Sequence, residues 1–532
     1  MNFALDTVDA ADPAARALVA LSREGERRTW SFGEVADGAA RLAGALAARG
    51  VGRGDVVATL IGNRPEWVLS MVACFRLGAV VLPCTEQLRP ADLRGRLTAV
   101  GTRLVVADVR NRPALTAALE GLDDAPAVVW IPDPALLDAP PTPAVALAPT
   151  DPCLITFTSG TSGGAKPVLH GQRYLAGQAL QAEHWLDAGP GDLVWCTAAS
   201  GWSKSARNVF IAPWLRGAAA LLHDAPFDPD ERLDVLEREA VSVLCMAPTE
   251  YRVIAKRAEL RAFPALRGLV AAGEALNPEV LRAWQEATGL EIRDGYGQTE
   301  TGQITGVPAG GRVKPGSMGR PLPGVRAWID GGELVVDPAT VPTFFLGYLG
   351  ETSGDTPTAT DGSGSGAPAA TDATGSGDAP AASPVAAVDR AADPAPWRTG
   401  DRVHVDDDGY LFFEGRTDDV IISAGYRIGP FEVESALVAH PAVAEAAAVA
   451  APDEERGSVV RAVVVLRDGH EPSAALATAL QDHVKATTAP YKYPRIVDFA
   501  DDLPKTTSGK VRRALLREQP VGGGPDPTPQ EA

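Results

Sequence analysis

The chain has 532 residues, 45% of them hydrophobic and 22% charged, which is typical of a globular protein with more than one domain. Its formal net charge of −19 at pH 7 argues against a nucleic acid as the default partner. The N-terminal segment "MNFALDTVDAADPAAR" has no basic start followed by an apolar run, so no secretory signal is predicted. The most apolar window, 69–84, is short and contains Arg76 and Gly78, so we expect no stable membrane insertion.

The cysteine pattern indicates a reducing compartment. Five cysteines are scattered along the chain without a Cys-x-x-Cys pair: Cys74, Cys84, Cys153, Cys196 and Cys245. Such spacing predicts small buried thiols in a cytoplasmic protein rather than disulfides or a metal site. The sequence leaves the oligomeric state open between a monomer and a homodimer.

Helix-like and strand-like segments alternate over the first 350 residues. Apolar residues at helical spacing predict helices over 33–50 and 64–78. Short β-branched or aliphatic runs predict strands at 55–62, 79–83, 103–108, 127–131, 218–222, 241–248, 268–273, 325–330 and 332–337, and a later one at 409–415. This alternation predicts an α/β fold, with a large N-terminal domain of parallel or mixed sheets covered by helices.

Residues 350–396 interrupt this pattern. They contain seven acidic residues, one basic residue and no aromatic residue. Such a segment buries too little apolar surface to offset the entropy of ordering, which predicts a disordered insertion.

A small α+β unit is expected to begin at Asp418. Its predicted helices cover 430–440 and 474–488, and its predicted strands cover 459–466 and 495–500. We therefore expect three parts: an N-terminal domain over 1–417, a mobile C-terminal domain over 418–517 and a disordered tail over 518–532.

The stretch "TFTSGTSGGAKPVLHG", 156–171, allows three interpretations. As a spacer it would lack structured flanks, yet "LITF" before it predicts a strand and the residues after Lys166 predict a helix. As a serine-hydrolase turn it matches G-x-S-x-G, but no later histidine has a distinctive context. As a phosphate loop, a glycine-rich turn from strand to helix offers unpaired backbone N–H groups to an anion. We favour this last interpretation.

The loop fails the P-loop pattern, because Ala165 replaces its second glycine and Pro167 its Ser/Thr. It resembles instead the Thr/Ser/Gly-rich loop of the adenylate-forming superfamily, which comprises acyl-CoA synthetases, luciferases and peptide-synthetase adenylation domains. Four further blocks follow in that superfamily's order: "RDGYGQTETG" (293–302), "WRTGD" (397–401), "GRTDDVIISAGYRIGPFEVE" (415–434) and "PKTTSGK" (504–510). "GYRIGPFEVE", "APYKYPR" and "GWSKSARNVF" are most similar to the medium-chain acyl-CoA synthetase branch.

The resemblance implies that ATP, Mg²⁺ and coenzyme A are used to activate a small carboxylic acid. Lys510 would bridge the acid and the α-phosphate, Thr299 would contact the α-phosphate, and Glu300 would hold Mg²⁺. Asp401 would accept hydrogen bonds from both ribose hydroxyls, and Arg416 would lie near the ribose or phosphate. The β- and γ-phosphates would be held by Thr158, Ser159, Gly160, Thr161, Ser162, Gly163, Gly164 and Lys166. The adenine pocket would be lined by Gly273, Glu274, Ala275, Asp294, Gly295, Tyr296, Gly297 and Gln298.

The resemblance also implies a second half-reaction, in which the acyl group passes to the thiol of coenzyme A. The C-terminal domain would rotate about a hinge at Asp418, withdrawing Lys510 and bringing the Gly425 loop to the thiol tunnel. Basic side chains suit the phosphates of coenzyme A. The candidates on this side are Gln87, Ala424, Gly425, Tyr426, Arg427, Arg456, Lys485, Tyr493 and Arg495.

The acid itself is less constrained. Relatives that use acetate close the acyl pocket with a tryptophan at the position of Gly297, so an open pocket for a medium-length, branched or aromatic acid is expected. The same pocket would contain Trp202, Lys204 and Ser205, and Lys204 with Arg207 also allows a polar-tailed acid. A short-chain ligase remains an alternative.

The rival classes have less support. An amino-acid adenylation domain normally places an aspartate in the segment that corresponds to 201–210, which has none, and no carrier-protein serine motif follows residue 517. Transfer of the adenylate to a carrier protein or an amine remains open. No feature favours a luciferase-like oxygenase. An inactive scaffold would not need the catalytic set that is present.

Overall fold

The computed structural model describes residues 1–158, 165–273, 276, 278–350, 395–417, 419–423, 426–453, 456–488, 490–506 and 510–520. The predicted insertion lies outside these ranges except for residues 350, 395 and 396.

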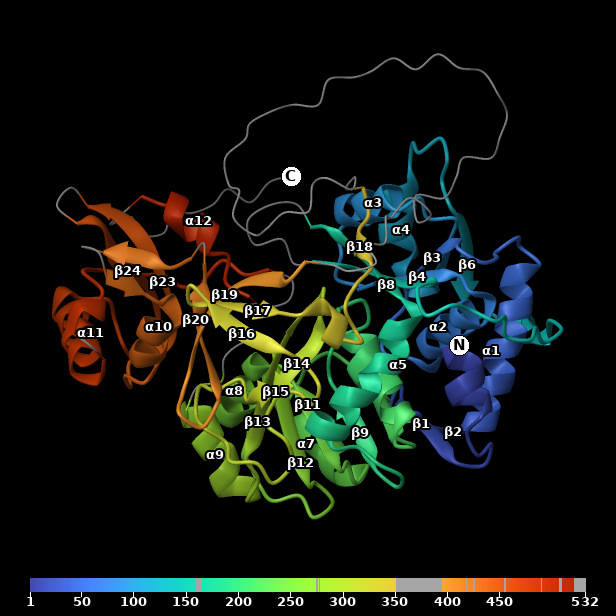
Figure 1. Ribbon diagram of the computed structural model, residues 1–532, viewed down its shortest axis with the longest axis horizontal. Coiled ribbons are helices and arrows are strands. Elements are labelled where there is room, and N and C mark those ends of the chain that lie inside the picture. Colours follow the sequence, from blue (N-terminus) through green and yellow to red (C-terminus); the bar gives the residue numbers. More distant parts are fainter. Residues whose placement is uncertain are drawn as a thin grey trace.

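A nine-stranded sheet carries much of the N-terminal domain (Figure 1). Its strand order is β15-β14-β13-β12-β11-β9-β10-β1-β2, parallel from β13 to β1 and antiparallel at both edges. The bounds are β1 (Arg16–Leu21), β2 (Arg27–Ser31), β9 (Leu193–Cys196), β10 (Ala219–His223), β11 (Val243–Met246), β12 (Gly268–Ala272), β13 (Ile292–Gln298), β14 (Gly302–Gly306) and β15 (Arg320–Pro321).

A seven-stranded sheet has the order β18-β8-β7-β4-β3-β5-β6, with a parallel body and an antiparallel β7-β8-β18 edge. Its strands are β3 (Val56–Leu60), β4 (Val80–Cys84), β5 (Leu104–Asp108), β6 (Ala127–Ile131), β7 (Pro152–Phe157), β8 (Pro167–Gly171) and β18 (Gly347–Tyr348).

Helices lie between the two sheets and on the outer face of each, so that the domain has five layers. One core packs α1 (Phe32–Ala47), α2 (Pro65–Leu77), α5 (Gln172–Gln181) and α6 (Ala212–Leu215) between the two sheets. A second core joins the outer face of the nine-stranded sheet to α7 (Pro229–Arg238), α8 (Pro248–Arg257) and α9 (Pro278–Thr288). A third joins the seven-stranded sheet to α3 (Pro90–Ala99) and α4 (Arg112–Leu119). Parallel strands covered on both faces explain the continuous apolar runs of the sequence.

Two smaller parts follow. An antiparallel sheet, β16-β17-β19-β20, consists of β16 (Ala327–Asp330), β17 (Glu333–Val336), β19 (Trp397–Val405) and β20 (Leu411–Arg416). The C-terminal α+β unit, in orange and red in Figure 1, has its own apolar core. It contains β21 (Ile421–Ser423), β22 (Tyr426–Ile428), α10 (Pro430–Val438), β23 (Val443–Asp453), β24 (Gly457–Leu466), α11 (Ala474–Thr487), β25 (Ile496–Phe499) and α12 (Arg513–Glu518).

The predicted α/β fold is confirmed, but two local predictions were wrong. The residues after Lys166 do not enter a helix directly: β8 first pairs antiparallel with β7, so the Gly-rich loop joins two strands. The predicted tail begins too early, because Glu518 ends α12 and the carbonyls of Gln519 and Pro520 accept hydrogen bonds from the buried Arg461. A buried guanidinium needs oxygen partners, and these two residues supply them.

Candidate active site

The 293–302 block and the 397–401 turn meet at one carboxylate. Asp401, in β19, is 5% exposed and accepts hydrogen bonds from the Tyr296 hydroxyl and, at 2.9 Å, from Gln298 Nε2. Arg416, its register partner in β20, lies 3.3 Å from the other carboxylate oxygen. Trp397 Nε1 donates to Gln298 Oε1 at 3.0 Å and so fixes which side of that amide faces Asp401. Two motifs a hundred residues apart therefore form one hydrogen-bonded unit.

The groups around Asp401 favour its ionised form, which accepts hydrogen bonds. Burial raises the pKa of its carboxyl, while Arg416, Tyr296, Gln298 and Lys510 act in the opposite direction. Burial, followed by the charge of Asp401, raises the pKa of Tyr296 well above its usual value, so the phenol stays protonated and donates. An ionised carboxylate at this position can accept from two hydroxyls of a ligand.

Lys510, in the C-terminal unit, has the smallest of the effects that lower the pKa of Asp401, after Arg416, Tyr296 and Gln298. The backbone of Lys510 pairs with Thr506: the Thr506 N–H donates to the Lys510 carbonyl at 2.8 Å, and the Lys510 N–H to the Thr506 hydroxyl at 3.2 Å. A bridge between Lys505 and Val511 continues this turn. Lys256 of α8 donates to the carbonyl of Ala444 in β23, at 3.1 Å, which is a contact between the two parts.

The base of the Gly-rich loop lies beside the predicted magnesium ligand. Thr158 and Lys166 close the loop with two 3.0 Å hydrogen bonds, one between their backbones and one from the Lys166 N–H to the Thr158 hydroxyl. Lys166 Nζ lies 5.1 Å from the centre of the Tyr348 ring, and the Tyr348 hydroxyl donates to Glu300 Oε1 at 2.7 Å. Tyr348 thus connects Lys166 to Glu300. Sequence reasoning missed Tyr348, which follows no motif and precedes the interrupted segment.

Several predicted residues lie outside the described residues: Ser159, Gly160, Thr161, Ser162, Gly163, Gly164, Glu274, Ala275, Asp418, Ala424 and Gly425. Tyr426 and Arg427 are described only as part of strand β22.

The predicted adenine side forms at the carboxyl ends of β12 and β13. Gly273 has φ +103°, a conformation that favours glycine, and Lys204 Nζ donates to the neighbouring Ala272 carbonyl at 2.7 Å. Burial raises the pKa of Asp294 well above its usual value, although the Gly295 N–H and the charge of Lys204 act against the shift. Lys204, predicted in the acyl pocket, therefore also borders the adenine side.

Gly297 has a structural role that the sequence did not reveal. A Cβ on this residue would lie 1.8 Å from the carbonyl oxygen of Gly302, because a register shift in the β13-β14 pair brings the two backbones together. In this chain, strand packing therefore gives a second reason for glycine here. The open acyl pocket at Gly297 stays a prediction.

The other predicted acyl-side residues share one turn. The Ser205 hydroxyl donates to the Trp202 carbonyl at 2.7 Å, and the Ser205 side chain is fully buried. The turn leads into the buried segment Arg207–Ile211, which packs beside β10 and α5.

Three of the predicted coenzyme A residues lie in one cluster, whereas Arg456 and Gln87 each lie elsewhere. Lys485 Nζ and the Arg495 guanidinium lie 4.4 Å and 5.0 Å from the centre of the Tyr493 ring. Arg456 pairs through its N–H with Asp453 at the β23 end. Gln87 is exposed just after β4, whereas α11, which carries Lys485, lies at the opposite end of the molecule (Figure 1). The described arrangement does not bring Lys485 and Gln87 together.

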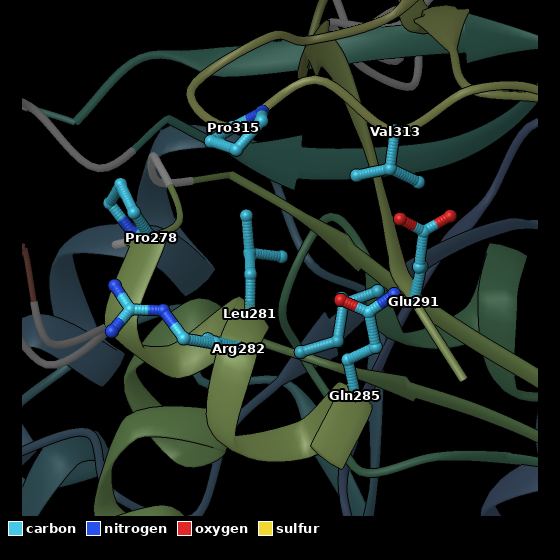
Figure 2. A pocket seen from close by; sticks show the side chains of 8 residues that line it. Pro278, Leu281, Arg282, Gln285, Glu291, Val313 and Pro315 are labelled. Atoms are coloured by element: carbon cyan, nitrogen blue, oxygen red, sulfur yellow. The ribbon is translucent and has the colours of Figure 1, made fainter. Parts of the chain in front are cut away.

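A surface hollow beside α9 lies away from these residues (Figure 2). Figure 2 shows Leu281, Arg282 and Gln285 of α9 facing Val313 and Pro315 across it. No predicted site residue is among the eight that line it.

Metal and membrane features are limited in the part of the chain that the structure describes. It contains no group of three or more His, Cys, Asp or Glu side chains arranged to hold a metal ion. Each described helix is too short or too polar to cross a lipid bilayer. All five cysteines are buried free thiols, as predicted.

Comparisons with known proteins agree with this geometry. The family model "AMP-binding enzyme" matches residues 5–342, and "AMP-binding enzyme C-terminal domain" matches residues 432–510. The chain is 39% identical to "Acyl-coenzyme A synthetase ACSM4, mitochondrial" of Rattus norvegicus over 98% of this chain and 91% of the rat protein. Its fold is similar to a benzoate CoA ligase from Burkholderia xenovorans LB400, with TM-score 0.79 and 27% identity over 97% and 100% of the two chains. ATP-bound MatB from Rhodopseudomonas palustris gives TM-score 0.79 and 26% identity over 97% and 99%. The chain therefore belongs to the AMP-binding enzyme family and, within this adenylate-forming superfamily, to the acyl-CoA synthetases.

Proposed function

We propose that this ATP-dependent acid:CoA ligase activates a medium-length, branched or aromatic acid, with Lys510 driving adenylation and the C-terminal unit then turning at Asp418. The observation that carries the proposal is the convergence of Tyr296, Gln298, Arg416 and Lys510 on Asp401. Four motifs that are separated in sequence supply these residues, and the fifth, the Gly-rich loop, reaches the Glu300 segment through Tyr348.

The first half-reaction joins two anions. The acid carboxylate attacks the α-phosphorus of ATP, the bond to the β-phosphate breaks, and pyrophosphate leaves as acyl-AMP forms. Positive charge in place before the reaction lowers this barrier. Lys510 would stabilise the charge that develops between the acid and the α-phosphate, while Asp401 holds the ribose. Lys166, beside Tyr348, would neutralise the leaving pyrophosphate.

Glu300 fits a magnesium ion that is bound mainly by ATP. Mg²⁺ in nucleotide sites commonly takes one or two carboxylates, with phosphate oxygens and water completing its shell. Glu300 is a buried carboxylate with one oxygen held by the Tyr348 hydroxyl. The ion would neutralise phosphate charge, and Tyr348 would fix the direction in which Glu300 presents its oxygens.

The second half-reaction needs a different arrangement. Lys510 now acts on Asp401, and the Lys485–Tyr493–Arg495 cluster lies on α11 and beside β25. A turn about Asp418 would exchange Lys510 for the Gly425 loop and carry this cationic cluster toward the nucleotide of coenzyme A. The thiolate then attacks the acyl carbon and AMP leaves.

The acid is proposed to lie against residues 201–210. Buried side chains from this segment border β11 and α5, next to the Thr299 region. The name of the benzoate CoA ligase supports an aromatic acid as one possibility.

One assay tests the whole proposal. Release of pyrophosphate with acetate, hexanoate and benzoate, with and without coenzyme A, should show kcat/KM for hexanoate or benzoate at least tenfold above acetate, and thioester should appear only with coenzyme A. Equal values for all three acids would contradict the acid class. Adenylate without a thioester would favour transfer to a carrier protein or an amine.

A further inference from the structure

Arg207 is buried without a counter-ion. Its side chain is 3% exposed and forms one hydrogen bond, with the Tyr174 side chain, while Nε and Nη1 have no hydrogen-bond partner. Among the described residues, no carboxylate forms an ion pair with it. Each of the other buried arginines of the described chain meets a carboxylate or several carbonyls, although Nε of Arg76 and of Arg232 also lacks a partner. Arg76 has Asp9, Arg232 has His223 and Glu250, Arg293 has three carbonyls, and Arg461 has Asp498 and three carbonyls.

This arrangement is costly unless a ligand completes it. An unpaired charge removed from water is strongly destabilising, and a guanidinium cannot escape by losing its proton. The four other buried arginines show that this fold does supply oxygens where arginine is structural. Arg207 therefore indicates an acceptor that is brought in from outside the chain.

The surroundings of Arg207 are polar and also incompletely paired. Gln181, at the end of α5, donates through Nε2 to Asn208 Oδ1 at 3.0 Å, but its own Oε1 has no partner. Asn208 points its amide at Cys245 Sγ, 3.9 Å away. Tyr174 of α5 also faces the guanidinium: burial raises the pKa of this phenol, and Arg207 acts to lower it. The wall around Arg207 thus offers hydrogen bonds rather than an apolar surface.

His170 relates this wall to the reacting atoms. Burial, followed by the charges of Arg207 and Arg173, lowers the pKa of His170 to about 3, against an opposite effect of the Thr299 backbone. The His170 ring therefore stays neutral at pH 7, and its centre lies 4.0 Å from that of the Tyr174 ring. The backbone beside it is joined to the Glu300 segment, because Leu346 N–H donates to the Leu169 carbonyl at 2.7 Å and Phe345 N–H to the Glu300 carbonyl at 2.8 Å. Thr299, the proposed α-phosphate residue, directly precedes Glu300, so Tyr174 and His170 connect Arg207 with the segment that is proposed to hold the phosphate.

The second cation of the segment is already used. Lys204 Nζ donates to the Ala272 carbonyl at 2.7 Å and faces the adenine side. Arg207 is consequently the group of 201–210 that can receive a charged substrate end.

We propose that the acid is a dicarboxylic acid: one carboxylate is adenylated beside Lys510, and the second, at the far end of the chain, forms an ion pair with Arg207 on the wall of Tyr174, Gln181 and Asn208. This inference rests on the proposed function, because it takes the acid to lie against residues 201–210. It replaces a general medium-length acid with one that carries charge at both ends.

The test compares acids of equal length that differ only in the second carboxylate. Acid-dependent AMP formation is measured for butanoate and succinate, pentanoate and glutarate, hexanoate and adipate, and heptanoate and pimelate. At the fitting length the dicarboxylate should have a kcat/KM about 10²-fold above its partner, the scale expected for a desolvated ion pair. If the wild-type enzyme has a higher kcat/KM for the monocarboxylate at every length, the inference is overturned.

Arg207→Met keeps an unbranched, flexible side chain, although a shorter one, and removes its charge. The variant should lose about 10²-fold in kcat/KM for the best dicarboxylate, mainly through KM, and should keep or improve the value for the monocarboxylate. Arg76→Met, a buried arginine whose carboxylate is Asp9, is the matched control and should change both acids alike. An unchanged preference in Arg207→Met would contradict the inference.

Failure of the proposed function and failure of the Arg207 inference give different results. If no acid of either series gives coenzyme A-dependent AMP formation, the proposed function fails. If the monocarboxylates are ligated and the dicarboxylates are not, only the role of Arg207 fails.

Discussion

The ribose side and the acid side of the site are both built from buried polar side chains, but these are paired differently. Asp401 has three partners from the chain itself, and each of its oxygens is engaged. Arg207, Gln181 and His170 keep donor or acceptor atoms without a partner. The ATP side is therefore organised before any ligand arrives, whereas the acid side needs the acid to complete its hydrogen bonds.

The comparison predicts how variants should divide. Changes on the ATP side should affect every acid equally, because they act on the common substrate. Changes at Arg207 should affect acids unequally. Three variants on the ATP side test the first half of this statement, and a deletion outside the site follows them, from the largest expected effect to the smallest.

Lys510→Ala should reduce acyl-AMP formation by about 10²–10³-fold, the usual scale for the loss of one preorganised charge. Because Lys510 leaves the site before thioester formation in the proposed mechanism, supplied acyl-AMP should still react with coenzyme A. Single-turnover assays of each half-reaction measure this difference. Loss of both half-reactions would mean that Lys510 supports the fold rather than the chemistry.

Asp401→Asn keeps the shape of the side chain but removes its charge. It should lower kcat/KM for ATP by about 10–10²-fold, since hydrogen bonds to charged groups contribute roughly 1.5–3 kcal/mol. Steady-state kinetics with two different acids should give the same factor for both. Tyr296→Phe, which removes one donor to Asp401, is the control and should cost less. If the decrease in kcat/KM differs between the two acids, Asp401 does not act on the ATP side alone.

Burial at Asp401 also predicts a pH effect. Because burial raises the pKa of this carboxyl, it should take up a proton at a higher pH than an exposed aspartate as the solution is acidified. The protonated form accepts ribose hydroxyls less well, so KM for ATP should rise on the acid side. This rise should be absent in Asp401→Asn, and its persistence there would assign it to another group.

Tyr348→Phe should lower adenylation by about three- to tenfold, because one hydrogen bond to Glu300 is lost and such a bond contributes roughly 1 kcal/mol. The ring that faces Lys166 remains. The measured effect should be a higher KM for magnesium-ATP with little change between acids. A wild-type KM would show that Glu300 needs no help from Tyr348.

Deletion of residues 352–394 should change kcat by less than about twofold, since a segment of this composition is predicted to carry no site. Activity and thermal unfolding of the shortened enzyme measure this. A large loss of kcat would show that the segment takes part in catalysis or its control.

The sequence was a good guide wherever local pattern and local structure agree. The helices at α1 and α2 and the strands β3, β5, β11 and β12 follow apolar periodicity, and the structure has them where they were predicted. Prediction failed where pairing with a neighbouring strand decides the secondary structure. β8 was taken as the start of a helix, and the alanine-rich β23 was missed because alanine favours helices in isolation.

The site shows the same limit. Motif spacing identified Asp401, Glu300, Lys166 and Lys510, because the chemistry of ATP requires those residue types in that order. Tyr348 carries no motif, and only the β8-β18 pair brings it to Lys166 and Glu300. Gly297 was interpreted as an open pocket, and the approach of Gly302 gives a second reason for the glycine.

By itself, the sequence determined the family of the protein and its layered α/β fold, and it selected the residues that we propose to face ATP, since these follow from local pattern and from fixed motifs. Only the tertiary structure decided which buried polar groups are satisfied. Arg76 and Arg207 are both buried arginines, and the sequence around them does not distinguish them. One meets a carboxylate that is 67 residues away and the other meets none, because a partner depends on which distant segments the fold brings together.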